Sequence, residues 1–152
     1  MVKIHLKNVS PSLMMLKNTK VTIPGLFSPR SEQISVASFD GVLNLIKSKR
    51  RPRILRMYGS DSKTYDFLLK GGEDMRQDER VMQLLTLVNT LLEKDDETEK
   101  KDLKIITYPV IPLSMNAGLL GWVQNCDTLH QLIKDYRQSN FIMVEAERNM
   151  QR

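Results

Sequence analysis

Four short runs in the first half of the chain are rich in apolar residues and separated by turn residues, the pattern typical of β-strands. Strands are therefore expected at residues 34–39, 42–47, 54–58 and 65–69. Asp40-Gly41 predicts a tight turn between the first two strands, and Gly59-Ser60-Asp61 predicts one between the last two, so each pair should form a hairpin. Residues 1–33, punctuated by proline and glycine, are expected to be irregular.

The pattern changes after Gly71-Gly72 to the three- and four-residue spacing of an amphipathic helix. Its apolar stripe is formed by Val81, Leu84, Leu85, Val88, Leu91 and Leu92. Asp74 is the expected N-cap, and Gln77 follows three residues later as in a capping box. The charged residues 93–102 then predict an exposed loop.

Two further strands are expected in the last third of the chain, at residues 103–108 and 119–123. Asp127 should cap a helix that runs to about Arg137, and residues 141–150 could begin another helix. Several strands, one long helix and further strands make an α+β fold, and 152 residues are enough for one domain.

The composition is that of an ordinary globular domain, with 41% hydrophobic and 27% charged residues. No apolar run approaches the roughly 18 residues that a membrane-spanning helix needs, and no secretory signal is visible. The single cysteine, Cys126, cannot form an internal disulfide, which favours a reducing compartment. The expected location is the cytoplasm, with the nucleus and the surface of endomembranes as alternatives.

Basic residues are concentrated in the first half of the chain. Residues 1–76 carry a charge of +8 (14 Lys/Arg against 6 Asp/Glu), and residues 77–152 carry −3 (9 against 12). Six basic residues cluster between Lys47 and Arg56. The cluster could bind nucleic acid, an anionic membrane or nucleotide phosphates, or it could be a solvated turn and strand face. No aromatic residue is interleaved with it, which argues against stacking on single-stranded nucleic acid.

Two residues suggest ligand binding when each is considered by itself. Lys70 ends an apolar strand and precedes two glycines and an acidic helix start, which suits a lysine that grips phosphates. The alternative is a strand-end lysine in solvent. Trp122, the only tryptophan, could pack in the core or stack on a planar ligand. His5 and His130 have no partners at metal-ligand spacing, so no metal site is predicted, and no hydrolase motif is present.

Several blocks together resemble the N-lobe of the phosphatidylinositol-3-kinase-related protein kinases. They are SKRRP at 48–52, FLLKGGEDMRQDERVMQ at 67–83, YPVIPLS at 108–114 and GWV at 121–123. Residues 87–92 and 126–137 resemble the target-of-rapamycin subfamily in particular, as do residues 9–15 and 23–25. The resemblance implies a linker at residues 1–33, a kinase N-lobe with its hinge at 34–124, and the start of a C-lobe at 125–152.

The resemblance also implies an ATP-binding cleft. Lys70 would contact the phosphates, and the turn 46–52 would cover them, with Ser48 approaching the phosphates. Ile46, Pro52 and Leu68 would wall the cleft.

Deeper in this implied cleft, Asp78 and Tyr108 would line an inner pocket beside Lys70. Glu73 is a second candidate for the counter-charge of Lys70, and the sequence does not choose between Glu73 and Asp78.

The implied hinge consists of three consecutive residues. Backbone groups of Gly121 and Val123 would bond the adenine edge while Trp122 packs on its face, and Thr128 would lie near the hinge exit.

Two local departures from the family pattern stand near this cleft. Gly72 replaces a histidine, and Arg50 replaces a common glutamine. Neither change removes a group expected to contact phosphate or adenine, so nucleotide recognition is still expected.

The chain lacks the family's Asp-Arg-His-x-x-Asn and Asp-Phe-Gly motifs, which supply the base-like aspartate and the magnesium ligands. The expected function is therefore the ATP-binding N-lobe of a serine/threonine kinase that is inactive alone, with Mg²⁺ bound only in the complete kinase. The expected partners are the nucleotide and the protein substrates and accessory subunits of that kinase, and no nucleic acid. A non-catalytic interaction or regulatory module is the alternative.

Overall fold

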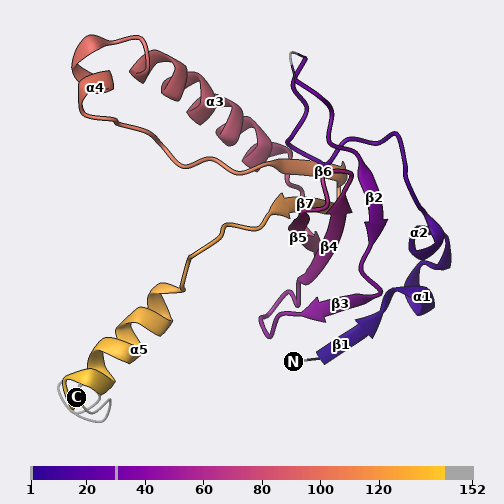
Figure 1. Ribbon diagram of the computed structural model, residues 1–152. Coiled ribbons are helices and arrows are strands. Elements are labelled where there is room, and N and C mark those ends of the chain that lie inside the picture. The colour runs from indigo at the N-terminus through magenta and orange to yellow at the C-terminus, as the bar shows by residue number, and fades with distance from the viewer. Residues whose placement is uncertain (1, 30, 143–152) are drawn as a thin grey trace. The chain divides into compact units, whose positions relative to one another are not determined.

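The computed structural model describes residues 2–29 and 31–142, and Figure 1 labels their helices and strands. The chain divides into two units, Met1–Trp122 and Val123–Arg152, and each is described by itself. The first unit contains a seven-stranded antiparallel sheet in the order β1-β3-β4-β5-β7-β6, with β2 also paired to β4. The mixture of strands and helices confirms the predicted α+β fold. The strands are β1 (Val2–His5), β2 (Val36–Phe39), β3 (Val42–Leu45), β4 (Arg53–Gly59), β5 (Thr64–Gly71), β6 (Val110–Ser114) and β7 (Ala117–Gly121).

The four strands expected between residues 34 and 69 are all present, but β2 and β3 do not form a hairpin. Both pair with β4 instead, through Phe39↔Met57 and Asn44↔Ile54. The backbone N–H of Asp40 donates to the Arg56 carbonyl at 3.0 Å, so the chain stays beside β4 where the hairpin turn was expected. The carboxylate of Asp40 accepts from the N–H of Val42 at 3.0 Å.

The second predicted hairpin, between β4 and β5, is confirmed. The N–H of Gly59 donates to the Lys63 carbonyl at 2.9 Å, and the Asp61 carboxylate accepts from the N–H of Lys63 at 3.1 Å. The other carboxylate oxygen of Asp61 accepts from the Tyr65 hydroxyl at 2.8 Å. This side-chain bond closes the turn onto β5.

Tyr65 should titrate at a higher pH than an unperturbed tyrosine. Burial of the phenol raises the pKa of Tyr65, and the hydrogen bond to Asp61 and the charge of Asp61 raise it further. The neutral phenol therefore contributes stability that is fully present below about pH 10, the unperturbed value, and is lost as pH rises through the raised pKa. The pH at which Tyr65 ionises should be measurable from the difference in phenolate absorbance between the wild type and Tyr65→Phe. Asp61→Asn should move the ionisation of Tyr65 part of the way back toward the unperturbed value. An ionisation that does not move would contradict the pairing of Tyr65 with Asp61.

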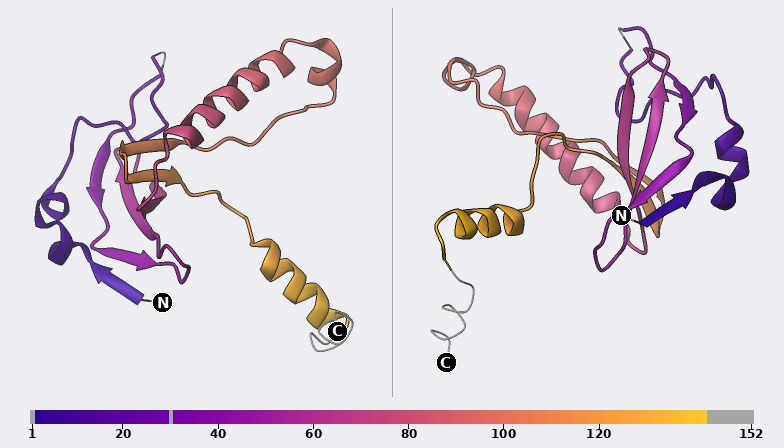
Figure 2. Two further views of the ribbon diagram at one scale, coloured as in Figure 1. Left: turned by 180° about the vertical axis from the view of Figure 1, so that it is seen from behind. Right: turned by 60° about the horizontal axis from the view of Figure 1, so that its bottom comes forward.

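The N-terminal segment is part of the fold rather than irregular throughout. Residues 2–15 form β1, α1 (Leu6–Val9) and α2 (Pro11–Met15), and β1 pairs with β3. Leu6 and Ile23, only 2% and 1% exposed, join the core cluster of the sheet. The expectation of an irregular segment is wrong here because these elements are too short to show a periodicity, and the sheet stabilises them. In both views of Figure 2, α1 and α2 lie beside β1 and β2, which they contact.

The long predicted helix is α3 (Arg76–Leu92), which is followed by the short α4 (Asp96–Lys100) inside the expected loop. The N-cap of α3 is Met75 rather than Asp74, and it makes no side-chain cap bond, so the predicted capping box is wrong. Met75 is fully buried, and its sulfur lies beside Gly118, where an added Cβ would be 2.5 Å away. The helix start is thus set by packing against β7. Asp74 still accepts from the N–H of Arg76 at 3.0 Å.

Only part of the apolar stripe of α3 is covered. Leu85, Val88 and Leu92 are half-buried, whereas Leu84 and Leu91 are each 59% exposed. The buried polar residue of the helix is Asn89. Its amide donates to the Ile105 carbonyl and accepts from the Ile105 N–H, both at 2.8 Å.

The strand expected at 103–108 is absent, because the Asn89 amide takes the two backbone groups of Ile105 that a neighbouring strand would bond. The strand of this region is β6, which begins at Val110.

The second unit contains α5 (Leu129–Ser139). Its N-cap is Thr128, whose hydroxyl accepts from the N–H of Gln131 at 3.1 Å, so the predicted Asp127 cap is wrong by one residue. Residues 143–150 of the further predicted helix lie outside the described residues. Across residues 2–29 and 31–142, no helix is long and apolar enough to cross a membrane.

Candidate functional site

Lys70 and Glu73 form an ion pair at the end of β5. The Lys70 ammonium lies 3.1 Å from the Glu73 carboxylate, and each side chain is 31% exposed. Glu73 is therefore the counter-charge that the structure pairs with Lys70, whereas Asp78 is exposed on the first turn of α3. Lys70 is neither free nor fully solvated, so the alternative of a strand-end lysine in solvent does not hold.

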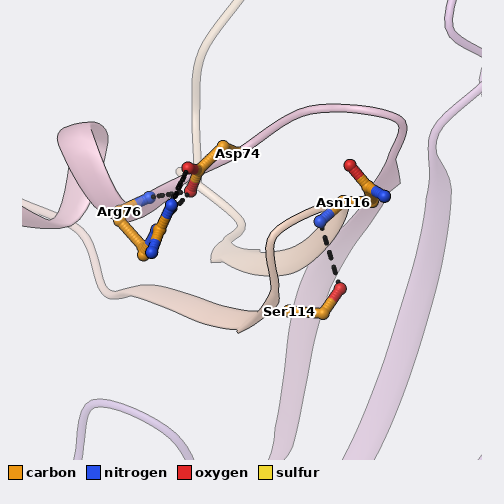
Figure 3. A network of polar contacts seen from close by, with 4 residues as sticks. All are labelled: Asp74, Arg76, Ser114 and Asn116. Atoms are coloured by element: carbon orange, nitrogen blue, oxygen red, sulfur yellow. Dashed lines mark hydrogen bonds and ion pairs between the residues drawn. The ribbon is translucent and has the colours of Figure 1, made fainter.

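The connection from β5 to α3 is tied to the β6–β7 turn by a backbone hydrogen bond. Figure 3 shows the Asp74–Arg76 contact of the connection and the Asn116–Ser114 contact of the turn. Gly72, at φ +76°, donates its N–H to the Asn116 carbonyl at 2.6 Å. The N–H of Asn116 donates to the Ser114 hydroxyl at 3.1 Å. The Arg76 guanidinium bonds the Asp74 carboxylate and holds the pKa of Asp74 below its usual range. These contacts fix the segment that presents Glu73 to Lys70.

Arg50 joins the turn 46–52 to the Lys70–Glu73 pair. Its guanidinium donates to the Gly72 carbonyl, and its Nε lies 3.8 Å from the Glu73 carboxylate. A Cβ added at Gly72 would lie 3.5 Å from Arg50 Nη1. The two departures from the family pattern, Arg50 and Gly72, are thus in contact. An ion pair this exposed contributes on the order of 0–1 kcal/mol, so the turn is held weakly.

The turn itself is well defined by its backbone. The N–H of Ile46 donates to the Pro52 carbonyl at 2.9 Å, and the N–H of Arg51 donates to the Ser48 carbonyl at 3.1 Å. Pro52 is buried, Ile46 is half-buried and Ser48 is exposed. A hollow of about 500 Å³ beside the turn is lined by Leu45, Lys47, Ser48 and Arg51.

The basic cluster divides into two parts with different roles. Lys47, Lys49 and Arg51 are exposed on the turn. Arg56 instead pairs across β4 and β5 with Asp66, through two hydrogen bonds of 2.7 and 2.8 Å. These bonds, and then the charge of Asp66, raise the pKa of Arg56 above its already high usual value. Arg56 therefore stabilises the pairing of β4 with β5, whereas Lys47, Lys49 and Arg51 present positive charge on the turn.

An apolar strip lies on the side of the sheet opposite the core. Phe67 points into the core, so the alternation of β5 places Leu68 and Lys70 on the other face. Leu68 is paired with Ile54 of β4 and Leu120 of β7, and all three are half-buried. A flat ligand could lie on this strip with its charged end toward Lys70.

Trp122 lies beside this strip at the end of β7. The backbone N–H of Trp122 donates to the Asp66 carbonyl at 2.9 Å, and 37% of the residue is exposed. The indole is therefore at the rim of the first unit and not in the core. Gly121 precedes it and donates its N–H to the Pro109 carbonyl at 2.8 Å. Val123 and Thr128 belong to the second unit, where Thr128 caps α5.

Tyr108 lines a different hollow, of about 500 Å³, between α3 and residues 107–111. Gly25, Met82 and Thr86 also line it, but Lys70 does not. Sequence reasoning expected Tyr108 and Lys70 to line one inner pocket, whereas this hollow is lined by Tyr108 without Lys70. Within the described part of the chain, no group of three or more His, Cys, Asp or Glu residues could hold a metal ion.

Sequence reasoning missed three residues that shape this site: Asn89, Pro109 and Asn116. Each acts on a residue distant in the sequence, and none belongs to a local pattern that indicates a contact. Arg50 and Gly72 could be noticed in the sequence because both depart from the family pattern. Nothing in the sequence showed that they contact each other.

Comparisons with known proteins agree on one family. The sequence profile described as "Phosphatidylinositol 3- and 4-kinase" matches residues 64–151. The chain is 49% identical over 144 residues to the serine/threonine-protein kinase TOR of Arabidopsis thaliana. It is also 49% identical over 147 residues to the serine/threonine-protein kinase mTor of Drosophila melanogaster. These alignments cover 95% and 97% of the chain but only 6% of each relative.

The fold is similar to that of a solved protein, CtTel1, one of whose structures is described as its FAT and kinase domain. The structure of the open conformation of CtTel1 superposes with a TM-score of 0.70 at 28% sequence identity. The superposition covers 86% of this chain and 5% of that chain.

Proposed function

The chain belongs to the phosphatidylinositol 3- and 4-kinase family, and on that premise we propose that it is the ATP-binding part of a target-of-rapamycin-like serine/threonine kinase. Its nucleotide would lie on the strip of Ile54, Leu68 and Leu120, with phosphates toward Lys70 and adenine toward the hinge. The chain spans 6% of the relatives' length, so the protein substrates and accessory subunits of a complete kinase belong to the same proposal.

The observation that carries this proposal is the Lys70–Glu73 ion pair at one end of a half-buried apolar strip. A phosphate-binding lysine must be held in place in the empty site, and the 3.1 Å contact with Glu73 supplies that restraint. Trp122 stands at the other end, since Gly121 pairs with Phe67 while Lys70 pairs with Gly118. Lys70 lies three residues after Phe67 along β5, so about 10 Å of strand separates the cation from the position opposite Gly121.

Phosphoryl transfer is outside the proposed capacity of these 152 residues. The two motifs that supply the base-like aspartate and the magnesium ligands are absent from the sequence. The described residues also lack a cluster of carboxylates that fits Mg²⁺. The expected activity of these residues is therefore nucleotide binding alone.

Nucleotide binding can be tested through Trp122, because it is the only tryptophan in the chain. A titration with ATP should change the indole emission saturably, and adenosine without phosphates should bind more weakly. A fluorescent ATP analogue, displaced by ATP, should report the same affinity for the wild type as the emission titration does. Absence of saturable binding would contradict the proposal. Transfer of labelled phosphate to a protein substrate would contradict the expected inactivity of the chain.

A further inference from the structure

Pro109 lies between two glycines that are far apart in the sequence. A Cβ added at Gly25 would lie 2.5 Å from Cβ and 2.8 Å from Cγ of Pro109. A Cβ added at Gly121 would lie 2.6 Å from Cδ and 2.7 Å from Cγ of the same ring. Distances this short leave no room for a side chain on either glycine. The proline ring is thus packed directly against both backbones.

Gly25 is held in place by a tight turn of the N-terminal segment. The N–H of Leu26 donates to the Ile23 carbonyl at 3.0 Å, with Pro24 and Gly25 between them and Gly25 at φ +83°. Proline followed by a glycine of positive φ is the signature of a type II β-turn. Ile23 is buried in the core and bonds the Ile34 carbonyl through its N–H at 2.8 Å. The turn is therefore a fixed support for one side of Pro109.

On its other side, Pro109 faces Gly121 as its partner in the antiparallel ladder. The register Val110↔Leu120 places Pro109 opposite Gly121, and the Gly121 N–H donates to the Pro109 carbonyl at 2.8 Å. Residues that face each other in this way normally exchange two hydrogen bonds. Proline has no N–H, so it cannot donate the second bond to the Gly121 carbonyl.

We propose that Pro109 reserves the Gly121 carbonyl for the amino group of adenine, and that the turn 23–26 braces Pro109 in this position. The inference rests on the proposed nucleotide site and names its base preference and the residue responsible. An ordinary residue at position 109 would donate its N–H to Gly121 and occupy the acceptor. Since the Gly121 N–H is already bonded to Pro109, the carbonyl is the group of Gly121 that remains for a base. A carbonyl accepts only from donors, so the site selects a base with an amino group at this edge.

The test compares ATP with inosine triphosphate, in which a carbonyl replaces the amino group of adenine. The wild type should prefer ATP by about five-fold, the change expected for one hydrogen bond. Pro109→Ala supplies an N–H that competes for the Gly121 carbonyl, and the preference for ATP should fall toward one. Pro112→Ala is the matched control, because Pro112 lies in the same strand but opposite Gly118. That variant should keep the preference of the wild type.

The possible results separate this inference from the proposed function. If the wild type binds neither nucleotide, the proposed function fails and the inference fails with it. If the wild type binds both equally, or Pro109→Ala keeps the full preference, the inference alone is overturned. The wild-type comparison decides the question even where Pro109→Ala does not fold.

The support of Pro109 by the turn 23–26 is tested with a variant that introduces no N–H at position 109. Gly25→Ala places a methyl group against Pro109 and should lower ATP affinity and shift the emission of Trp122 in the empty protein. Gly41→Ala is the control, because its Cβ would meet only the end of the Met14 side chain, at 3.4 Å. If Gly25→Ala leaves both readouts at the wild-type values, the bracing role is wrong.

Discussion

Replacing Lys70 with alanine should lower the affinity of the chain for ATP by about 10- to 100-fold, the loss expected for a hydrogen bond to a charged group. The ammonium is held 3.1 Å from Glu73, at the end of β5 where the phosphates are proposed to lie. Adenosine, which has no phosphates, should bind the variant and the wild type about equally. Displacement of a fluorescent ATP analogue measures both affinities.

Lys63→Ala is the matched control for this loss. Lys63 is an exposed lysine at the other end of the β4–β5 hairpin, 3.8 Å from the Asp61 carboxylate. Removing it takes away the same charge without touching the proposed phosphate position, so ATP affinity should change little. An equal loss in both variants would indicate binding through overall positive charge, as the alternative interpretation of the basic cluster expects. Binding of that kind would also weaken steeply with added salt.

Replacing Leu6 with alanine should lower the free energy of unfolding by about 2–5 kcal/mol, a large share of the roughly 5–15 kcal/mol that stabilises a domain. Leu6 is 2% exposed and packs in the core cluster with Leu43, Leu55 and Phe67. Its N–H also donates to the Gly41 carbonyl at 2.9 Å. Denaturant unfolding followed by circular dichroism measures the change.

Leu16→Ala tests whether this cost comes from burial. Leu16 belongs to the same N-terminal segment but is 44% exposed, so its truncation should change the free energy of unfolding by less than about 0.5 kcal/mol. If Leu6→Ala costs no more than Leu16→Ala, the N-terminal segment does not contribute to the core and the packing described here is wrong.

Whether a prediction from the sequence was right depended on how far apart in the sequence the interacting residues lie. The strands between residues 34 and 69 and the helix α3 were predicted because short apolar runs between turn residues and helical spacing are local patterns. The hairpin of β2 and β3 was wrong because the Asp40 N–H bonds the Arg56 carbonyl, and local turn residues carry no information about that partner. The strand at 103–108 was wrong for a similar reason, since the Asn89 amide bonds Ile105 from 16 residues away.

The same distinction holds at the candidate site. Lys70 could be named from the sequence because a strand-end lysine before an acidic helix start is a local arrangement, and the family resemblance supplied its two possible carboxylates. The choice of Glu73 required the structure, in which Gly72 at φ +76° turns the chain and the Asn116 carbonyl holds it there. Trp122 likewise needed its position at the end of β7 before it could be placed at the rim.

The sequence by itself determined the strands between residues 34 and 69, the helices α3 and α5, the residue types available for binding phosphates and a base, and the resemblance to a kinase family. These depend on chemistry and spacing within a few residues. Only the tertiary structure decided which carboxylate faces Lys70, that Arg50 reaches Gly72, and that Gly25 and Gly121 enclose Pro109. These are contacts between segments that are distant in the sequence. The sheet and its core bring the segments together, because burying apolar surface is favourable however far apart the residues lie in the sequence.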